Sequence, residues 1–206
     1  MTTELTKMRT WLIIAWLILL SSGIAFLFWY TEWKYTMPTP VPQNYQAIRT
    51  GQYIDVEGKL TRTNKPLLLH FFNPSCPCSR FNIPHFKFLV KHYGDKIDFV
   101  VVVISGNKNY TAKEIQDKFD LKIPVVFDKS LAVLCGVYST PQAVILDSCS
   151  NLYFRGNYNK SRYCTDAKSN YAQMALDSLL EHHSNPGFNQ YALKAYGCRL
   201  PGCTKQ

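Results

Sequence analysis

The sequence around the first two cysteines, PLLLHFFNPSCPCSRFNIPHF at residues 66–86, decides the fold. It starts with a continuous apolar run of strand length, Leu67 to Phe72, which is typical of a strand buried on both faces. Cys76 and Cys78 follow where this strand ends and a helix begins. Because backbone amides and the helix dipole stabilise an anion there, the sequence predicts a lowered pKa for the Cys76 thiol, with Arg80 one turn further on adding to the effect.

Outward from this segment, strand-like and helix-like patterns alternate along the chain. Thr111 followed by Glu114 predicts a capping box at the start of a short helix. Further strands are expected at residues 97–104, 123–127, 143–146 and 152–154, and helices after residue 77, after 111, at 131–135 and from about Asp166. This order predicts an α/β fold with an antiparallel hairpin at the edge of the sheet.

The N-terminal part contains twenty successive residues without a charge, 11–30. At about 1.5 Å per residue, a helix of this length reaches roughly 30 Å and can span a bilayer. A cleaved signal peptide is the alternative, but its apolar region should be about 7 to 15 residues long. Lys7 and Arg9 precede the span, so we expect a single-pass protein of the cell (inner) membrane with a cytoplasmic N-terminus and a periplasmic or otherwise extracytoplasmic C-terminal domain.

Length and composition allow one globular domain plus the anchor and exclude disorder and collagen. The expected organisation is a cytoplasmic N-terminus at 1–10, a transmembrane anchor at 11–30, a proline-containing linker at 31–49, a folded domain at 50–183 and a cysteine-containing tail at 184–206. The chain carries a net charge of +9. Outside the cytoplasm this charge favours anionic membranes or acidic partners over nucleic acid, and a generic basic surface explains it equally well.

The cysteine segment resembles the thioredoxin superfamily, in particular its membrane-anchored redoxins of the TlpA and ResA type. The resemblance covers roughly residues 50–183 and rests on the cysteine motif, on Pro84, on the stretch IPVVFDKSLAVLCGVYSTP at 123–141 and on the hairpin that begins at Thr140 and Pro141. It implies a thioredoxin-like fold, a central mixed β-sheet flanked by helices. It also implies a cis bond before Pro141, with Thr140 and Pro141 as the platform for a protein substrate.

The motif departs from the usual Cys-x-x-Cys of that family, because Ser79 stands where the second cysteine is expected. Residues two apart on a helix point away from each other, so a Cys76–Cys78 disulfide would be strained and labile. The alternative is a resolving thiol from elsewhere. In the inferred fold the loop 156–164 returns to the catalytic face, which makes Cys164 the candidate.

The remaining cysteines have other predicted roles. Cys149 lies in the hairpin turn, about 20 Å from the catalytic face at roughly 3.3 Å per strand residue, so a Cys149–Cys164 bridge is disfavoured. Cys135 lies on an apolar helical face, which predicts a packing role. Cys198 and Cys203 predict a local disulfide in the tail or, as the sharper alternative, a shuttle pair.

These observations predict an extracytoplasmic thiol:disulfide oxidoreductase that acts on protein disulfides through Cys76, with Cys78 or alternatively Cys164 resolving the mixed disulfide. The expected partners are a protein thiol or disulfide substrate and a membrane or extracytoplasmic redox protein, with no cofactor, metal or nucleic acid. The alternative is a Sco-like Cu(I) metallochaperone that uses Cys76 and Cys78, because soft thiolates select Cu(I). That family resemblance is poorer, since it requires Cys-x-x-x-Cys and a later histidine before the closing helix, whereas His182 and His183 come at that helix's end.

Overall fold

The computed structural model describes residues 2–33, 36–106, 109–183 and 186–200, and the chain forms two compact units, Met1–Met37 and Pro38–Gln206. The first unit consists of helix α1 (Thr2–Phe28), continued by the π-helical turn η1 (Trp29–Trp33). Within the helical stretch Thr6–Trp33, a segment of 18 residues has a mean hydropathy of 2.4, and none of its residues is buried. By length and composition this helix can cross a membrane, as the sequence predicted, and its orientation stays a prediction.

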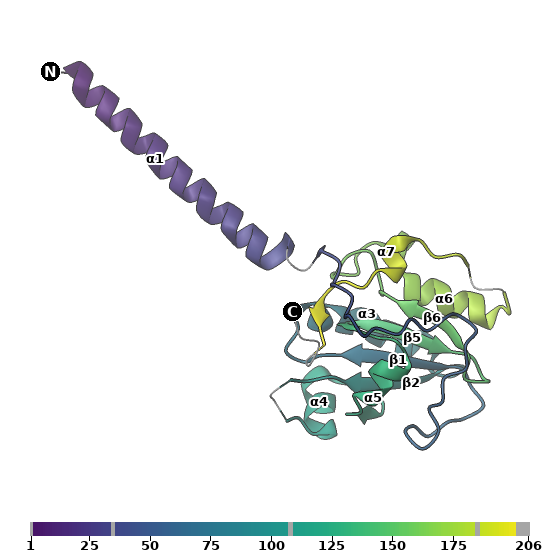
Figure 1. The fold of residues 1–206 in the computed structure, drawn as a ribbon. Coiled ribbons are helices and arrows are strands. Elements are labelled where there is room, and N and C mark those ends of the chain that lie inside the picture. Colours follow the sequence, from purple (N-terminus) through teal and green to yellow (C-terminus); the bar gives the residue numbers. More distant parts are fainter. Residues whose placement is uncertain (1, 34–35, 107–108, 184–185, 201–206) are drawn as a thin grey trace. The chain divides into compact units, whose positions relative to one another are not determined.

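The second unit is built on a mixed sheet of five strands in the order β3-β2-β1-β5-β6 (Figure 1). The strands are β1 (Leu67–Phe72), β2 (Asp98–Val103), β3 (Val125–Val126), β5 (Gln142–Leu146) and β6 (Leu152–Gly156). β1 pairs in parallel with β2 and antiparallel with β5, so it occupies the centre of the sheet. A separate two-stranded sheet joins β4 (Ser139–Thr140) to β7 (Cys198–Arg199), which is the yellow arrow of Figure 1.

Helices cover both faces of the five-stranded sheet. They are α3 (Pro77–Tyr93), α4 (Ala112–Phe119), α5 (Ser130–Leu134), the 3-10 turn η2 (Ala167–Ser169), α6 (Tyr171–Leu180) and α7 (Gln190–Leu193). Leu68 of β1 belongs to one core cluster together with Phe86 of α3 and Leu176 of α6. Leu69 belongs to the other, with Leu131 of α5. The alternation along β1 therefore builds two cores, which explains its continuous apolar sequence.

The element boundaries differ from the expected ones most clearly at two places. The closing helix starts at Tyr171 and not near Asp166, because the Asp166 side chain accepts a hydrogen bond from the amide of Lys168 and caps η2 instead. Asn170, with φ −74° and ψ 71°, then separates η2 from α6. The third strand shortens to the two residues of β3. The capping box of Thr111 and Glu114 is present at the start of α4, as predicted.

His70 lies in the centre of β1, inside the core, with no exposed surface. Its ring stacks on Phe86, with the centroids 4.2 Å apart, and Nδ1 lies 2.7 Å from the Tyr158 hydroxyl. Burial lowers the pKa of His70 to about 3, so the folded protein holds this imidazole neutral.

We expect His70 to make the protein sensitive to acid. In the unfolded chain a histidine has a pKa of about 6.5, so between this pH and about pH 3 the unfolded state binds one more proton than the folded state. The free energy of unfolding should therefore fall by about 1.4 kcal/mol per pH unit through this window as the pH decreases. The free energy of unfolding can be measured by denaturant unfolding of the full-length protein in detergent at several pH values. Its change per pH unit should be smaller by this amount in the His70→Phe variant. Equal slopes would contradict the assignment.

Candidate active site

Cys76 lies at the junction between the central strand and helix α3, where it is the N-cap residue. The Cys76 amide donates to the carbonyl of Asn73 at 3.0 Å, and the Cys76 carbonyl accepts from the amide of Arg80 at 3.1 Å. Pro77 occupies the first turn, where no intrahelical hydrogen bond is lost. This places the Cys76 sulfur at the end of the helix where backbone amides stabilise a thiolate.

The Cys76 sulfur is joined in a disulfide to Cys198, which lies 122 positions further along the chain. The Cα atoms of the two residues are 6.0 Å apart, and Cys76 is 2% exposed. The expected local pairing of Cys198 with Cys203 is not seen; Cys203 lies outside the described residues, and Cys198 is bonded to Cys76 instead. The C-terminal segment thus forms part of the site.

Thr140 lies directly beside the Cys76 sulfur, and Pro141 follows it in the chain. The peptide bond between them is cis, as the family resemblance implied, and Cys76 Sγ lies 3.7 Å from the carbonyl oxygen of Thr140. The backbone next to this bond is already paired, because Thr140 lies opposite Cys198 and Ser139 opposite Arg199 in an antiparallel ladder. The structure therefore brings together Cys76, Thr140 and Pro141 and adds strand β7 to them.

Close approach of β7 to this backbone requires Gly197. Its φ is +112°, a conformation that other residues rarely adopt, and a Cβ there would clash with the carbonyl oxygen of Thr140. The Ser139 hydroxyl lies 3.1 Å from the carbonyl oxygen of Tyr196 and 3.2 Å from that of Cys198. Residues on both sides of Gly197 are thus tied to β4.

Cys78 and Ser79 occupy the first turn of α3 and have no exposed surface. Cys78 is a thiol and is not bonded to Cys76. Ser79, which stands where a second motif cysteine is expected, has its Oγ 3.3 Å from the amide of Asn73 and accepts its hydrogen bond. Position 79 therefore has a structural role, since it holds the loop that precedes Cys76.

Cys164 lies against helix α3, as the inferred topology predicted for its loop. The Asn82 side chain donates a hydrogen bond to Cys164 Sγ at 3.1 Å. Burial raises the pKa of Cys164 to about 11, so the thiol form dominates near neutral pH. The pKa of Tyr196 is raised by burial and further by the neighbouring sulfurs of Cys164 and Cys78.

Two cysteines lie away from this site. Cys135 is fully buried in the core beside α5, where burial raises its pKa to about 12, and this agrees with a packing role. Cys149 is exposed in the turn between β5 and β6. In the part of the chain that the structure describes, no three His, Cys, Asp or Glu side chains form a group suited to hold a metal ion.

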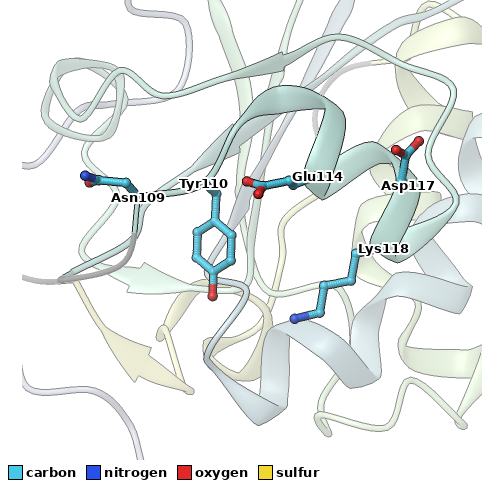
Figure 2. Close-up of a pocket in the computed structure, with 5 residues that line it drawn as sticks. All are labelled: Asn109, Tyr110, Glu114, Asp117 and Lys118. Atoms are coloured by element: carbon cyan, nitrogen blue, oxygen red, sulfur yellow. The ribbon is translucent and has the colours of Figure 1, made fainter.

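A surface pocket lies over helix α4 and the residues before it (Figure 2). The residues that line it are Asn109, Tyr110, Glu114, Asp117 and Lys118. They are polar or charged apart from the Tyr110 ring, and none of them is a site residue predicted from the sequence. The lining of this pocket thus contains no cysteine.

Comparison with known proteins relates the chain to one family and to several solved structures. The matching family model, described as a domain of unknown function, DUF6436, spans residues 45–201. No curated protein sequence matches the chain. An uncharacterized conserved protein from Geobacillus kaustophilus is 18% identical, with a TM-score of 0.60 and coverage of 80% of this chain and 96% of its own.

Two further structures show similar values. A hypothetical protein from Sinorhizobium meliloti 1021 is 18% identical over 76% of this chain and 96% of its own, with a TM-score of 0.60. The solution structure of a thioredoxin-like protein in the oxidized form is 18% identical over 71% of this chain and 97% of its own, with a TM-score of 0.49. At such identities the likeness concerns the fold. The observed central mixed sheet flanked by helices confirms the predicted fold class, whereas the TlpA and ResA type stays a prediction.

Proposed function

The chain belongs to the DUF6436 family, and we propose that it is a membrane-anchored thiol:disulfide oxidoreductase that acts on protein disulfides through Cys76. One observation carries the proposal: the Cys76 sulfur, at the N-terminus of α3 and beside the cis Thr140–Pro141 bond, is engaged in a disulfide. Structural cysteines pack in cores, as Cys135 does, whereas reactive cysteines favour a helix N-terminus. The site therefore supports redox exchange better than a packing role.

The chemistry follows from this arrangement. In the reduced protein, the Cys76 thiolate attacks one sulfur of a substrate disulfide and forms a mixed disulfide, while the other substrate sulfur leaves as a thiolate. A second thiol of the protein then attacks Cys76, and the second substrate sulfur leaves. The substrate gains two electrons and the protein becomes oxidised. The sequence offers Cys78 or Cys164 as this second thiol.

We place this reaction outside the cytoplasm. Helix α1 can cross a membrane, and Lys7 and Arg9 lie before its apolar part, which favours a cytoplasmic N-terminus. Disulfides persist in oxidising compartments, and the Cys76–Cys198 bond fits such a location. The partners are then a protein thiol or disulfide substrate and a redox partner in or beside the membrane.

The alternative function is a Sco-like Cu(I) metallochaperone that uses Cys76 and Cys78. Two measurements distinguish it from the oxidoreductase. The full-length protein in detergent should accelerate the reduction of insulin by dithiothreitol by about 10-fold or more, since Cys76 is placed for nucleophilic attack. The reduced protein should lose Cu(I) to a competing chelator, because among the described residues no three His, Cys, Asp or Glu side chains form a group suited to hold a metal ion. Chelator-resistant, stoichiometric Cu(I) together with no insulin reduction would favour the metallochaperone.

A further inference from the structure

We propose that Cys198 is the resolving cysteine of this oxidoreductase and that strand β7 occupies the position at which a substrate strand pairs. This inference rests on the proposed function and specifies how its second half-reaction takes place. It replaces Cys78 and Cys164 in that step by a thiol from the C-terminal tail. The protein then carries in its own chain an occupant of its substrate site.

The pairing of β7 with β4 supports the second part of this proposal. Cys198 lies opposite Thr140, and the Thr140 hydroxyl lies 3.4 Å from the carbonyl oxygen of Cys198. An extended substrate segment that adds to β4 must use the same backbone groups of Ser139 and Thr140. The tail and a substrate strand therefore exclude each other, and β7 has to leave β4 before a substrate pairs there.

The tail has its most extensive contacts up to Tyr196. The Tyr196 hydroxyl donates to the carbonyl of Asn159 at 2.9 Å, the amide of Thr39 donates to the carbonyl of Ala195 at 2.7 Å, and Asn157 Nδ2 donates to the carbonyl of Lys194 at 2.7 Å. Ala192 and Ala195 have no exposed surface. Beyond Gly197 the tail has fewer contacts: the ladder with β4 has two residue pairs, and the Leu200 amide donates to the carbonyl of Tyr138 at 3.3 Å.

This division suits a mobile resolving thiol. The anchored part keeps Cys198 close to Cys76 and so gives it a high effective concentration. Gly197, at the start of the paired end, has the backbone freedom to act as the hinge. When the disulfide is reduced, the covalent restraint on β7 disappears while the anchor remains.

The two rival thiols are less well placed for the attack on Cys76. Cys78 is fully buried in the first turn of α3, where residues two apart point in different directions. Cys164 is part-buried, and its raised pKa favours the unreactive thiol form. Cys198 is the cysteine that the structure bonds to Cys76, and it is partly exposed.

The exchange balances as a two-electron reaction. Cys76 forms the mixed disulfide with the substrate, and the first substrate sulfur leaves and takes a proton from water. The Cys198 thiolate then attacks Cys76 Sγ, the bond between Cys76 and the substrate breaks, and the second substrate sulfur leaves as a thiol. The substrate disulfide has become a dithiol, and the dithiol of Cys76 and Cys198 has become a disulfide.

A single-turnover experiment tests the proposal on the full-length protein in detergent. The reduced protein, freed of reductant, is mixed with insulin, quenched with acid and alkylated, and its disulfides are mapped by mass spectrometry. All variants carry Cys203→Ala, so that the second tail cysteine cannot replace the first. We expect the parent to end with Cys76–Cys198, and Cys198→Ala to accumulate Cys76 linked to insulin at least about 10-fold above the parent. Cys149→Ala, the matched control, should behave like its parent.

A second pair of variants, in the same Cys203→Ala background, changes no further cysteine and tests the position of strand β7. Gly197→Val should displace β7 from β4 and slow formation of the Cys76–Cys198 bond about 10-fold or more, because the added side chain clashes with the Thr140 carbonyl and is strained at positive φ. Gly187→Val, in the same tail but with no atom near the added Cβ, should leave the rate unchanged.

The outcomes separate this inference from the function on which it rests. If Cys198→Ala releases insulin thiols at the parent's rate without a trapped species, or if the parent ends with Cys76 bonded to Cys78 or Cys164, the inference is wrong and the oxidoreductase stands. An unchanged rate of Cys76–Cys198 formation in Gly197→Val would overturn the role of β7. If no variant ever links Cys76 to insulin and the parent releases no insulin thiols, both proposals are overturned.

Discussion

Replacement of Cys76 by serine should abolish disulfide exchange, whereas replacement of Cys149 by serine should leave it nearly unchanged. Among the cysteines that the structure describes, Cys76 alone combines a helix N-terminus with a position beside the Thr140 carbonyl. A serine hydroxyl there has a far higher pKa than a thiol and cannot form the mixed disulfide. Cys149 is exposed in the turn between β5 and β6, so its substitution removes a thiol without disturbing the core.

Insulin reduction by dithiothreitol, with each full-length variant in detergent, gives the measurement. The Cys76→Ser rate should fall to the rate of dithiothreitol alone, a loss of about 10-fold or more, equal to the acceleration expected of the wild-type protein. Thermal unfolding of both variants checks that they are folded. A folded Cys76→Ser variant with wild-type activity would remove the basis of the proposed function.

The centre of this fold could be predicted because it is encoded locally. The apolar run from Leu67 to Phe72 matches β1 residue for residue, since a strand buried on both faces needs no polar alternation. Pro77 and the cysteine before it mark the start of α3 for an equally local reason, the missing amide hydrogen bonds of a first helical turn. The cis bond before Pro141 came from the family resemblance and not from the local sequence.

The boundaries that were missed depend on competition between neighbouring signals. Asp166 is a good N-cap and does cap a turn, but the chain leaves the helical conformation at Asn170 before α6 begins. The sequence identified Asp166 as a capping residue, but it did not show that Asp166 caps only the short turn η2. Similarly, the apolar run at 123–127 pairs with β2 through only two residues, and periodicity does not report how many residues find a partner.

The partner of Cys76 was missed because it is encoded by non-local contacts. The tail has no hydrophobic period. Its position depends on pairing with β4 and on contacts with residues as distant in sequence as Thr39. The signals present were indirect: an odd number of cysteines, a motif with Ser79 in place of a cysteine, and a glycine directly before Cys198. Spacing alone favoured a local bridge to Cys203, because proximity in sequence lowers the entropic cost of closing a loop.

A single substitution should also have a large effect on the docking of helix α7 against β6. Gly156 is the last residue of β6. The backbone amide of the next residue, Asn157, donates to the carbonyl of Ala192 at 2.8 Å. A Cβ on Gly156 would clash with that carbonyl oxygen and with the Phe154 ring. Because a backbone atom cannot give way as a flexible side chain does, Gly156→Val should push α7 off the sheet.

Undocking of α7 should weaken the bond between Cys76 and Cys198, since the anchor that holds Cys198 nearby is lost. We expect the equilibrium constant for this disulfide against glutathione to fall by about 10-fold to 100-fold, the range that a lost effective concentration produces. Alkylation and mass spectrometry across a series of glutathione ratios measure it. Hydrogen exchange should become faster over residues 190–200 while β1 stays protected.

Gly187→Val is the matched control, because it adds the same side chain to the same tail at a place with no neighbouring atom within 4 Å. Its disulfide equilibrium should equal that of the wild type. If Gly156→Val also keeps the wild-type equilibrium although α7 exchanges faster, docking of α7 does not position Cys198. The contacts of Tyr196 and the two residue pairs between β4 and β7 would then suffice to keep Cys198 beside Cys76.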